Sequence, residues 1–136
     1  MGITNTLSTV LWSAASTLSV TSATEVVSDA FTVDATTVSI GIQLSADNAG
    51  TPASGDTAVF RIRWSTDGGT TYDTAEHAQL LITLDTFTTN TPGEDPAKRS
   101  VYVEPIGTHF KVACICAQAA TRNVTIAALV REQRAA

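Results

Sequence analysis

The chain has 136 residues and a formal net charge of −5, with 43% hydrophobic and only 15% charged residues. This length fits one domain with a single hydrophobic core. The acidic balance and the scattering of eight Lys and Arg residues argue against nucleic-acid binding, which needs clustered cations. No segment approaches the roughly 20 apolar residues of a membrane-spanning helix, and no basic flank marks a secretory signal, so neither is expected.

Residues 1–24 are rich in Ser and Thr, with apolar residues spread through them in a weak strand pattern. The pattern predicts either the first one or two strands of the domain or an extended arm that lies across a neighbouring subunit. Leu11 and Trp12 are candidate protein contacts, because an aromatic residue on a terminal segment is expected to be buried either in its own domain or against a partner. Residues 1–6 match a myristoylation pattern, but no basic patch follows, and we expect no lipid anchor.

Residues 25–136 are expected to form a single β-sandwich domain. Its first two strands are predicted at 25–33 and 36–45, and the second has a clean alternation that places one row inward. This row is Val38, Ile40, Ile42 and Leu44.

A long surface loop is predicted at residues 46–56, which contain many turn formers and almost nothing to bury. Asp47, Asn48 and Pro52 are candidate protein contacts, because long loops often carry them. Asp47, Asn48 and Asp56 also offer oxygens to a calcium ion, but their spacing lacks the ligand alternation of a calcium loop. Turn chemistry is the preferred interpretation.

The clearest structural pattern in the sequence lies at residues 58–73, which are predicted to form a strand that runs into a tight turn. Period-two alternation places Arg61 and Arg63 outward and the apolar row of Ala58, Phe60, Ile62 and Trp64 inward. The two arginines are either a solvated surface or the ionic part of a subunit contact. The sequence Asp67-Gly68-Gly69 supplies the turn, because glycine accepts positive φ.

After the turn, residues 79–87 are predicted to be a strand with Leu80, Ile82 and Leu84 inward, although 75–81 could instead form a short helix. Two prolines mark residues 88–98 as a second loop. Its candidate protein contacts are Pro92, Glu94 and Asp95.

Three further strands are predicted at 100–104, 108–118 and 122–131. The inward rows of the last two are Phe110, Val112, Cys114 and Cys116, and Val124, Ile126, Ala128 and Val130. The two cysteines are expected to be reduced and buried, as in a protein assembled in a reducing cytoplasm.

Together these segments predict an all-β fold of seven to nine short strands with no substantial helix: an antiparallel β-sandwich or jelly roll. Periodicity does not separate a jelly roll from an immunoglobulin-like topology, because both have the same alternation.

The residues that could carry catalysis are few. His77 and His109 belong to separate stretches and share no motif, and a turn explains Asp67 and Asp73 better than a glycosidase pair does. We therefore expect no enzymatic activity, no cofactor and no metal site.

The turn sequence Ser65-Thr66-Asp67-Gly68-Gly69-Thr70-Thr71-Tyr72 resembles the Asp-box of sialidases and other β-propeller proteins, with Tyr72 where that pattern prefers tryptophan. In those families the box is a repeated hairpin turn remote from the catalytic centre. The resemblance implies a structural role for the turn residues, which are Ser65, Asp67, Gly68, Gly69 and Tyr72.

The chain as a whole resembles small virion proteins of tailed bacteriophages. The resemblance lies in the Ser- and Thr-rich start, residues 24–31, the turn at 64–72 and the closing strand at 124–131. It implies a head decoration or cement protein that sits on the capsid exterior, binds the major capsid protein and is assembled in the host cytoplasm. It also implies a homo-oligomer, with a trimer as the first hypothesis. The alternatives are a tail- or adaptor-associated domain, a carbohydrate-binding module and, third, a hydrolase.

Overall fold

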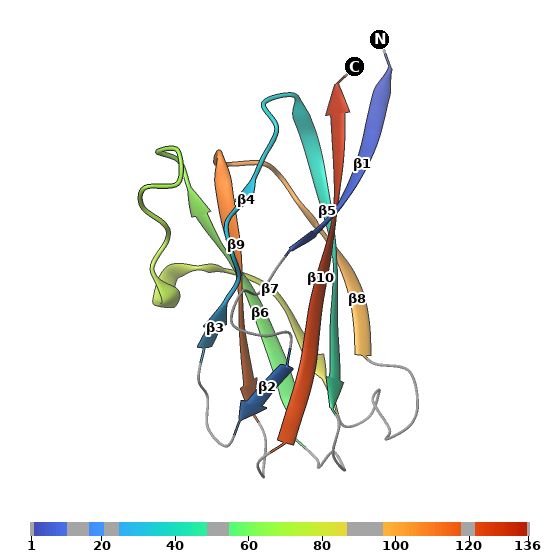
Figure 1. Ribbon diagram of the computed structural model, residues 1–136, viewed down its shortest axis with the longest axis vertical. Coiled ribbons are helices and arrows are strands. Elements are labelled where there is room, and N and C mark those ends of the chain that lie inside the picture. Colours follow the sequence, from blue (N-terminus) through green and yellow to red (C-terminus); the bar gives the residue numbers. More distant parts are fainter. Residues whose placement is uncertain are drawn as a thin grey trace.

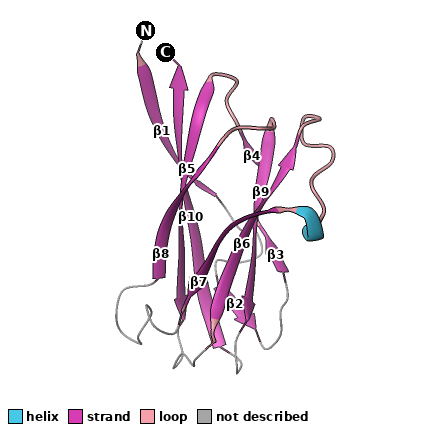
Figure 2. Ribbon diagram, turned by 180° about the vertical axis from the view of Figure 1, so that it is seen from behind, coloured by secondary structure: helices cyan, strands magenta, loops and turns pink. Residues whose placement is uncertain are grey.

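The computed structural model describes residues 2–10, 17–20, 25–48, 55–86, 97–117 and 122–135. Within these ranges the chain is almost entirely β-strand, and the one helical element is a single 3-10 turn, η1 (Ala75–His77). The ten strands within the described residues form two sheets that face each other, and both termini lie at the same end (Figure 1). Figure 2 shows the same two layers from behind, with the 3-10 turn at the side of the molecule.

Each sheet is a chain of antiparallel pairs. In the first sheet the order is β1 (Ile3–Val10), β10 (Arg122–Ala135), β5 (Thr37–Asn48) and β8 (Ala97–Val103), and β2 (Thr17–Val20) also pairs with β10. In the second sheet the order is β3 (Glu25–Val27), β9 (His109–Ala117), β6 (Thr57–Ser65) and β7 (Gln79–Asp85), and β4 (Phe31–Thr32) also pairs with β9.

The strand order identifies the topology as a jelly roll. β1 and β2 follow one another along β10, and β3 and β4 follow one another along β9, so each pair takes the place of one interrupted strand. The pairings are then nested: the first strand with the last, the second with the last but one, and so on inward to β6 with β7. This folded-over hairpin is the jelly-roll arrangement, and it decides the question that periodicity left open.

Four central strands supply the core, each through four alternate residues. The inward rows predicted for β6, β9 and β10 are confirmed, and all their members are at most 2% exposed. The Phe110 ring stacks on that of Phe31, with ring centres 4.9 Å apart, and meets Trp64 edge-on, with ring centres 5.3 Å apart. Both Cys114 and Cys116 are buried in the same layer as free thiols.

Two residues of the predicted inward rows face outward instead. Val38 is 51% exposed because the register between β5 and β10 shifts there: Ser39 pairs with Gln133 but Thr37 pairs with Arg134. Leu80 is 53% exposed for the same kind of reason. Phe60 pairs with Ile82 and Arg61 with Leu80, which leaves one extra residue on β7. A β-bulge of this kind reverses the side-chain alternation beyond it.

Some strand limits also differ from the sequence prediction. The stretch 25–33 is divided into β3 and β4 at Ser28. The Ser28 amide still donates to the Val112 carbonyl at 2.9 Å, but the Val112 amide donates in return to the Ser28 hydroxyl, also at 2.9 Å. β8 begins at Ala97, inside the predicted loop 88–98, and β10 continues to Ala135. The N-terminal segment contributes β1 and β2 to the first sheet.

Candidate functional site

The turn after β6 is organised around the carboxylate of Asp67. Its Oδ1 atom accepts hydrogen bonds from the Ser65 hydroxyl at 2.7 Å and from the backbone amides of Thr70 at 3.1 Å and Thr71 at 2.9 Å. Its Oδ2 atom accepts a hydrogen bond from the Thr71 hydroxyl at 2.6 Å. Gly68 and Gly69 follow with φ of 79° and 90°, a conformation that L side chains rarely adopt. The Asp-box-like residues therefore hold the backbone of the turn.

Side chains from β9 close over this turn. Lys111 Nζ lies 4.5 Å from the centre of the Tyr72 ring, which is a cation–π contact. A Cβ atom at Gly69 would stand 3.3 Å from the Tyr72 hydroxyl and 3.4 Å from the His109 ring, so the turn lies directly against both.

The segment between β8 and β9 clamps the base of the same turn. The Thr108 amide donates to the Ser65 carbonyl at 2.9 Å, and the Thr108 hydroxyl accepts from the Gly68 amide at 3.2 Å. Gly107 passes so close that a Cβ atom there would stand 2.3 Å from the Ser65 carbonyl oxygen. No local sequence pattern marks Gly107, because Ser65, whose carbonyl requires a glycine here, lies 42 positions away.

The hydrogen bonds to Asp67 favour its charged form. The Thr71 hydroxyl and amide, and then the Ser65 hydroxyl, hold the pKa of the Asp67 carboxyl well below its ordinary value. The folded state therefore binds a proton at Asp67 less readily than the unfolded state does. The resulting stabilisation is present above the ordinary carboxyl pKa of about 4 and is lost as the pH falls below it.

Replacing Asp67 with Asn is expected to lower the thermal midpoint at pH 7, and the difference from the wild type should shrink as the pH is lowered below about 4. Calorimetry of both proteins between pH 7 and pH 2.5 measures this directly. Asp34 also has a lowered pKa, caused mainly by the Thr36 hydroxyl and amide, so both proteins lose stability in acid and only their difference reports on Asp67. Asp29→Asn removes an exposed charge and serves as the control. A constant difference at all pH values would contradict this account.

The outer face of the second sheet carries a basic row, which consists of Arg61, Arg63 and Lys111. Arg63 is paired with Lys111 across the strands, and its guanidinium forms an ion pair with Glu25. Arg61 lies between Leu80 on one side and Ala113 on the other. Within the described residues, Arg61 forms no hydrogen bond or ion pair. The two arginines thus differ: Arg63 is neutralised by Glu25, while the cation of Arg61 has no partner among the described residues.

A buried carboxylate lies near the termini. Glu132 is 1% exposed and continues the inward row of β10. Its oxygens accept hydrogen bonds from Arg134 Nη2 at 2.8 Å, from the Thr37 hydroxyl at 2.6 Å and from the Asp34 amide at 3.2 Å. This network was not predicted, because the last predicted strand ends at Arg131, one residue before Glu132. The signal that could have found it is a carboxylate at an inward position.

The structure places only some of the predicted contact residues. Asp47 is exposed near the end of β5, and Asn48 is the last residue of that strand. Asp56 is fully buried whereas Asp47 is exposed, so the two carboxylates do not share one environment. This difference disfavours a calcium site formed by both. Six candidates lie outside the described residues: Leu11, Trp12, Pro52, Pro92, Glu94 and Asp95.

The remaining reactive side chains have local partners. His77 Nδ1 lies 3.1 Å from the Thr74 hydroxyl, and His109 Nδ1 lies 2.9 Å from the Thr108 hydroxyl. The two cysteine sulfurs are 3.8 Å apart, and the contact with Cys116 together with burial raises the pKa of the Cys114 thiol.

The described ranges contain no group of three or more His, Cys, Asp or Glu side chains that could hold a metal ion. They also contain no helix with the length and apolar character needed to span a membrane.

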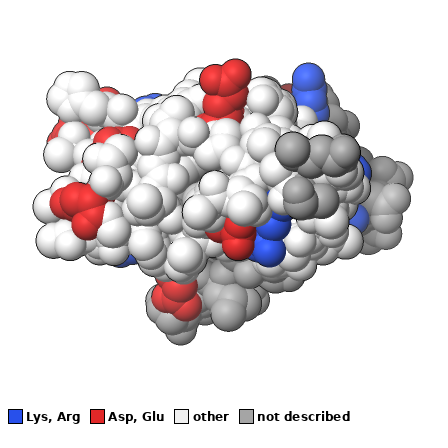
Figure 3. Space-filling model, turned by 90° about the horizontal axis from the view of Figure 1, so that it is seen from above, with Lys and Arg blue, Asp and Glu red and all other residues white. Residues whose placement is uncertain are grey.

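The surface is mostly uncharged. Figure 3 shows the end that carries both termini, where acidic and basic side chains are few and stand among a larger area of other residues. Leu7 is 67% exposed on β1, and Tyr102 is 65% exposed on β8. Such surface can be covered by a partner protein with little cost of desolvating ions.

Comparison with protein-family models gives no match, and comparison with curated proteins gives none either. Among solved structures, the chain is similar to a chain in the structure of the infectious bursal disease virus Gx strain, with a TM-score of 0.56 and 14% identity. The match covers 96% of this chain and 33% of the viral chain. For the Gt strain of the same virus the TM-score is 0.50 and the identity 14%, over 94% of this chain and 32% of the viral chain.

A third similar structure is dimeric latent PorU from Porphyromonas gingivalis, with a TM-score of 0.50 and 8% identity over 98% of this chain and 13% of that one. The two viral matches are capsid proteins, so the chain shares its sandwich fold with a domain of viral capsid proteins. It spans about a third of the length of those two viral chains. At this level of identity the likeness concerns the fold.

Proposed function

We propose that this chain is a non-enzymatic structural protein of a tailed-bacteriophage virion, which binds the exterior of the assembled capsid and stabilises it. The observation that supports the proposal is the fold: a jelly roll that matches a viral capsid protein over 96% of its own length. The fold alone does not define a function, since jelly rolls also occur in lectins and other proteins. The sequence resemblance to head decoration proteins selects this role among them.

The mechanism follows from mass action. A protein that binds only the assembled lattice, and bridges neighbouring major capsid subunits, shifts the equilibrium toward that lattice. Stable contacts of this kind bury about 1,200 to 2,000 Å² each. An oligomer, with a trimer as the first hypothesis, would multiply the contacts and raise the avidity.

The outer face of the second sheet is the surface that we assign to the capsid contact. It offers Arg61, which has no partner among the described residues, beside the 53%-exposed Leu80. Arginine is enriched at protein interfaces and among the residues that contribute most to binding. Arg63 and Lys111 border it but are held by Glu25 and Tyr72.

The carbohydrate-binding alternative needs exposed aromatic rings. Trp64 is 2% exposed and packs against Phe110, so it has no face for a sugar. Among the residues that the structure describes, Tyr102 is the one aromatic side chain that is largely exposed.

The direct test is to add the purified chain to expanded capsids that lack it. Co-sedimentation with the capsids and a higher temperature of capsid disruption are the expected results. Absence of binding, or binding with no gain in resistance to heat or chelator, would overturn the proposal.

Charge reversal at Arg61 tests the assigned surface. Arg61→Glu is expected to weaken capsid binding by about ten-fold or more, because an attractive charge at the interface becomes repulsive. Arg99→Glu makes the same change of charge at an exposed site on β8 of the other sheet, and it should bind as the wild type does. Capsid affinity measured by sedimentation separates the two variants. Equal affinity for both would remove this face from the contact.

A further inference from the structure

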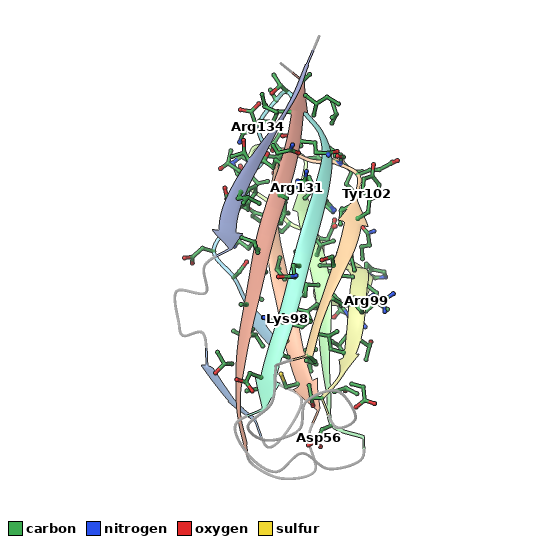
Figure 4. All side chains as sticks on the ribbon, turned by 90° about the vertical axis from the view of Figure 1, so that its right-hand side faces the viewer. Asp56, Lys98, Arg99, Tyr102, Arg131 and Arg134 are labelled. Atoms are coloured by element: carbon green, nitrogen blue, oxygen red, sulfur yellow. The ribbon has the colours of Figure 1, made fainter. Side chains whose placement is uncertain are left out.

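A second candidate site lies at the seam where the edges of the two sheets meet. β7 of the second sheet contacts β8 of the first, and beside this contact is a cavity of about 340 Å³. This volume lies at the small end of the range of small-ligand pockets. The lining residues are Gln79, Tyr102, Val103, Glu104 and Ile106. Figure 4 shows Tyr102 at the edge of the first sheet, with Arg99 further along the same strand.

The lining combines apolar surface with one charge. Tyr102 is 65% exposed and Ile106 60% exposed, while Val103, at 3%, belongs to the core beneath them. Two large apolar side chains are thus left in solvent around one hollow. Glu104 is exposed and is the one charged residue among the described residues of the lining. It forms no hydrogen bond or ion pair within the part of the chain that the structure describes, so its carboxylate is available.

We propose that this pocket binds an arginine side chain of a partner protein. The aliphatic stem of arginine matches Val103 and Ile106, and its planar guanidinium can stack on the Tyr102 ring. The Glu104 carboxylate supplies the acceptor that the guanidinium fork requires, and the Gln79 amide oxygen offers another. The charges are complementary, since the one charge on the described lining residues is negative and the whole chain carries −5.

This inference does not depend on the capsid role, because the chemistry of the lining selects the ligand whatever protein presents it. An anionic ligand would meet Glu104 with the wrong sign. A purely apolar side chain would bury the carboxylate without a partner, which costs free energy.

The test is an NMR titration of the full chain with N-acetyl-arginine amide. Saturable shifts are expected at Gln79, Tyr102 and Ile106, and they should weaken as salt is added. The uncharged analogue N-acetyl-citrulline amide has nearly the same shape and should produce much smaller shifts. Glu104→Gln should weaken arginine binding by about three- to ten-fold, the size expected for a charge-assisted hydrogen bond at a partly exposed site.

Glu76→Gln is the matched control, because Glu76 is an exposed carboxylate on η1 outside the cavity lining. It should leave arginine binding unchanged. The proposal is overturned if arginine and citrulline give equal shifts, if Glu104→Gln binds arginine as the wild type does, or if no saturable shift occurs at the lining residues. The amide spectrum of each free variant shows whether the fold is retained.

Discussion

Replacing Leu84 with alanine is expected to lower the free energy of unfolding by about 2–4 kcal/mol, whereas the same change at Leu80 should cost less than about 1 kcal/mol. Both leucines belong to β7, and strict alternation would place both inward. Leu84 is 7% exposed and packs in the core, so its truncation leaves a cavity. Leu80 lies beyond the bulge, opposite Arg61, and is 53% exposed.

Urea denaturation of the two variants and the wild type measures both changes, provided that the slope m stays constant. The pair is its own control, because the residue removed, the residue introduced and the strand are the same. Equal losses at the two positions would mean that the β7 register is uninterrupted and Leu80 faces the core.

The second large effect is expected at Gly107. Gly107→Ala should destabilise the chain by about 2 kcal/mol or more, since a Cβ atom 2.3 Å from the Ser65 carbonyl oxygen forces one backbone segment to move. That movement would also strain the hydrogen bond from the Thr108 amide to Ser65. The Asp67 turn should therefore loosen, and hydrogen exchange at the Thr70 and Thr71 amides should accelerate.

Gly41→Ala is the matched control for the same substitution. Gly41 lies in the middle of β5, and a Cβ atom there meets nothing within 4 Å. The change should be neutral or stabilising by up to about 1 kcal/mol, because alanine restricts the unfolded chain. If Gly107→Ala were equally mild, the close approach of the two backbones would be refuted.

The sequence by itself determined the class of the fold and most of the core. In β6, β9 and β10 the alternation is uninterrupted, and all the residues predicted to face inward there are buried. The turn at Asp67 was also predicted, because an aspartate followed by two glycines at the end of a strand is typical of a tight turn. These features depend on neighbours within a few residues, and local sequence carries that information.

Only the tertiary structure decided the rest. The bulges that turn Val38 and Leu80 outward depend on the register against β10 and β6, and no local pattern marks them. The jelly-roll order follows from pairings such as β1 with β10, whose residues are more than 100 positions apart. Gly107 and the Tyr102–Glu104 pocket became visible only when distant strands were placed together. Alternation is a property of one strand, whereas register, close backbone approach and a pocket are properties of two or more strands.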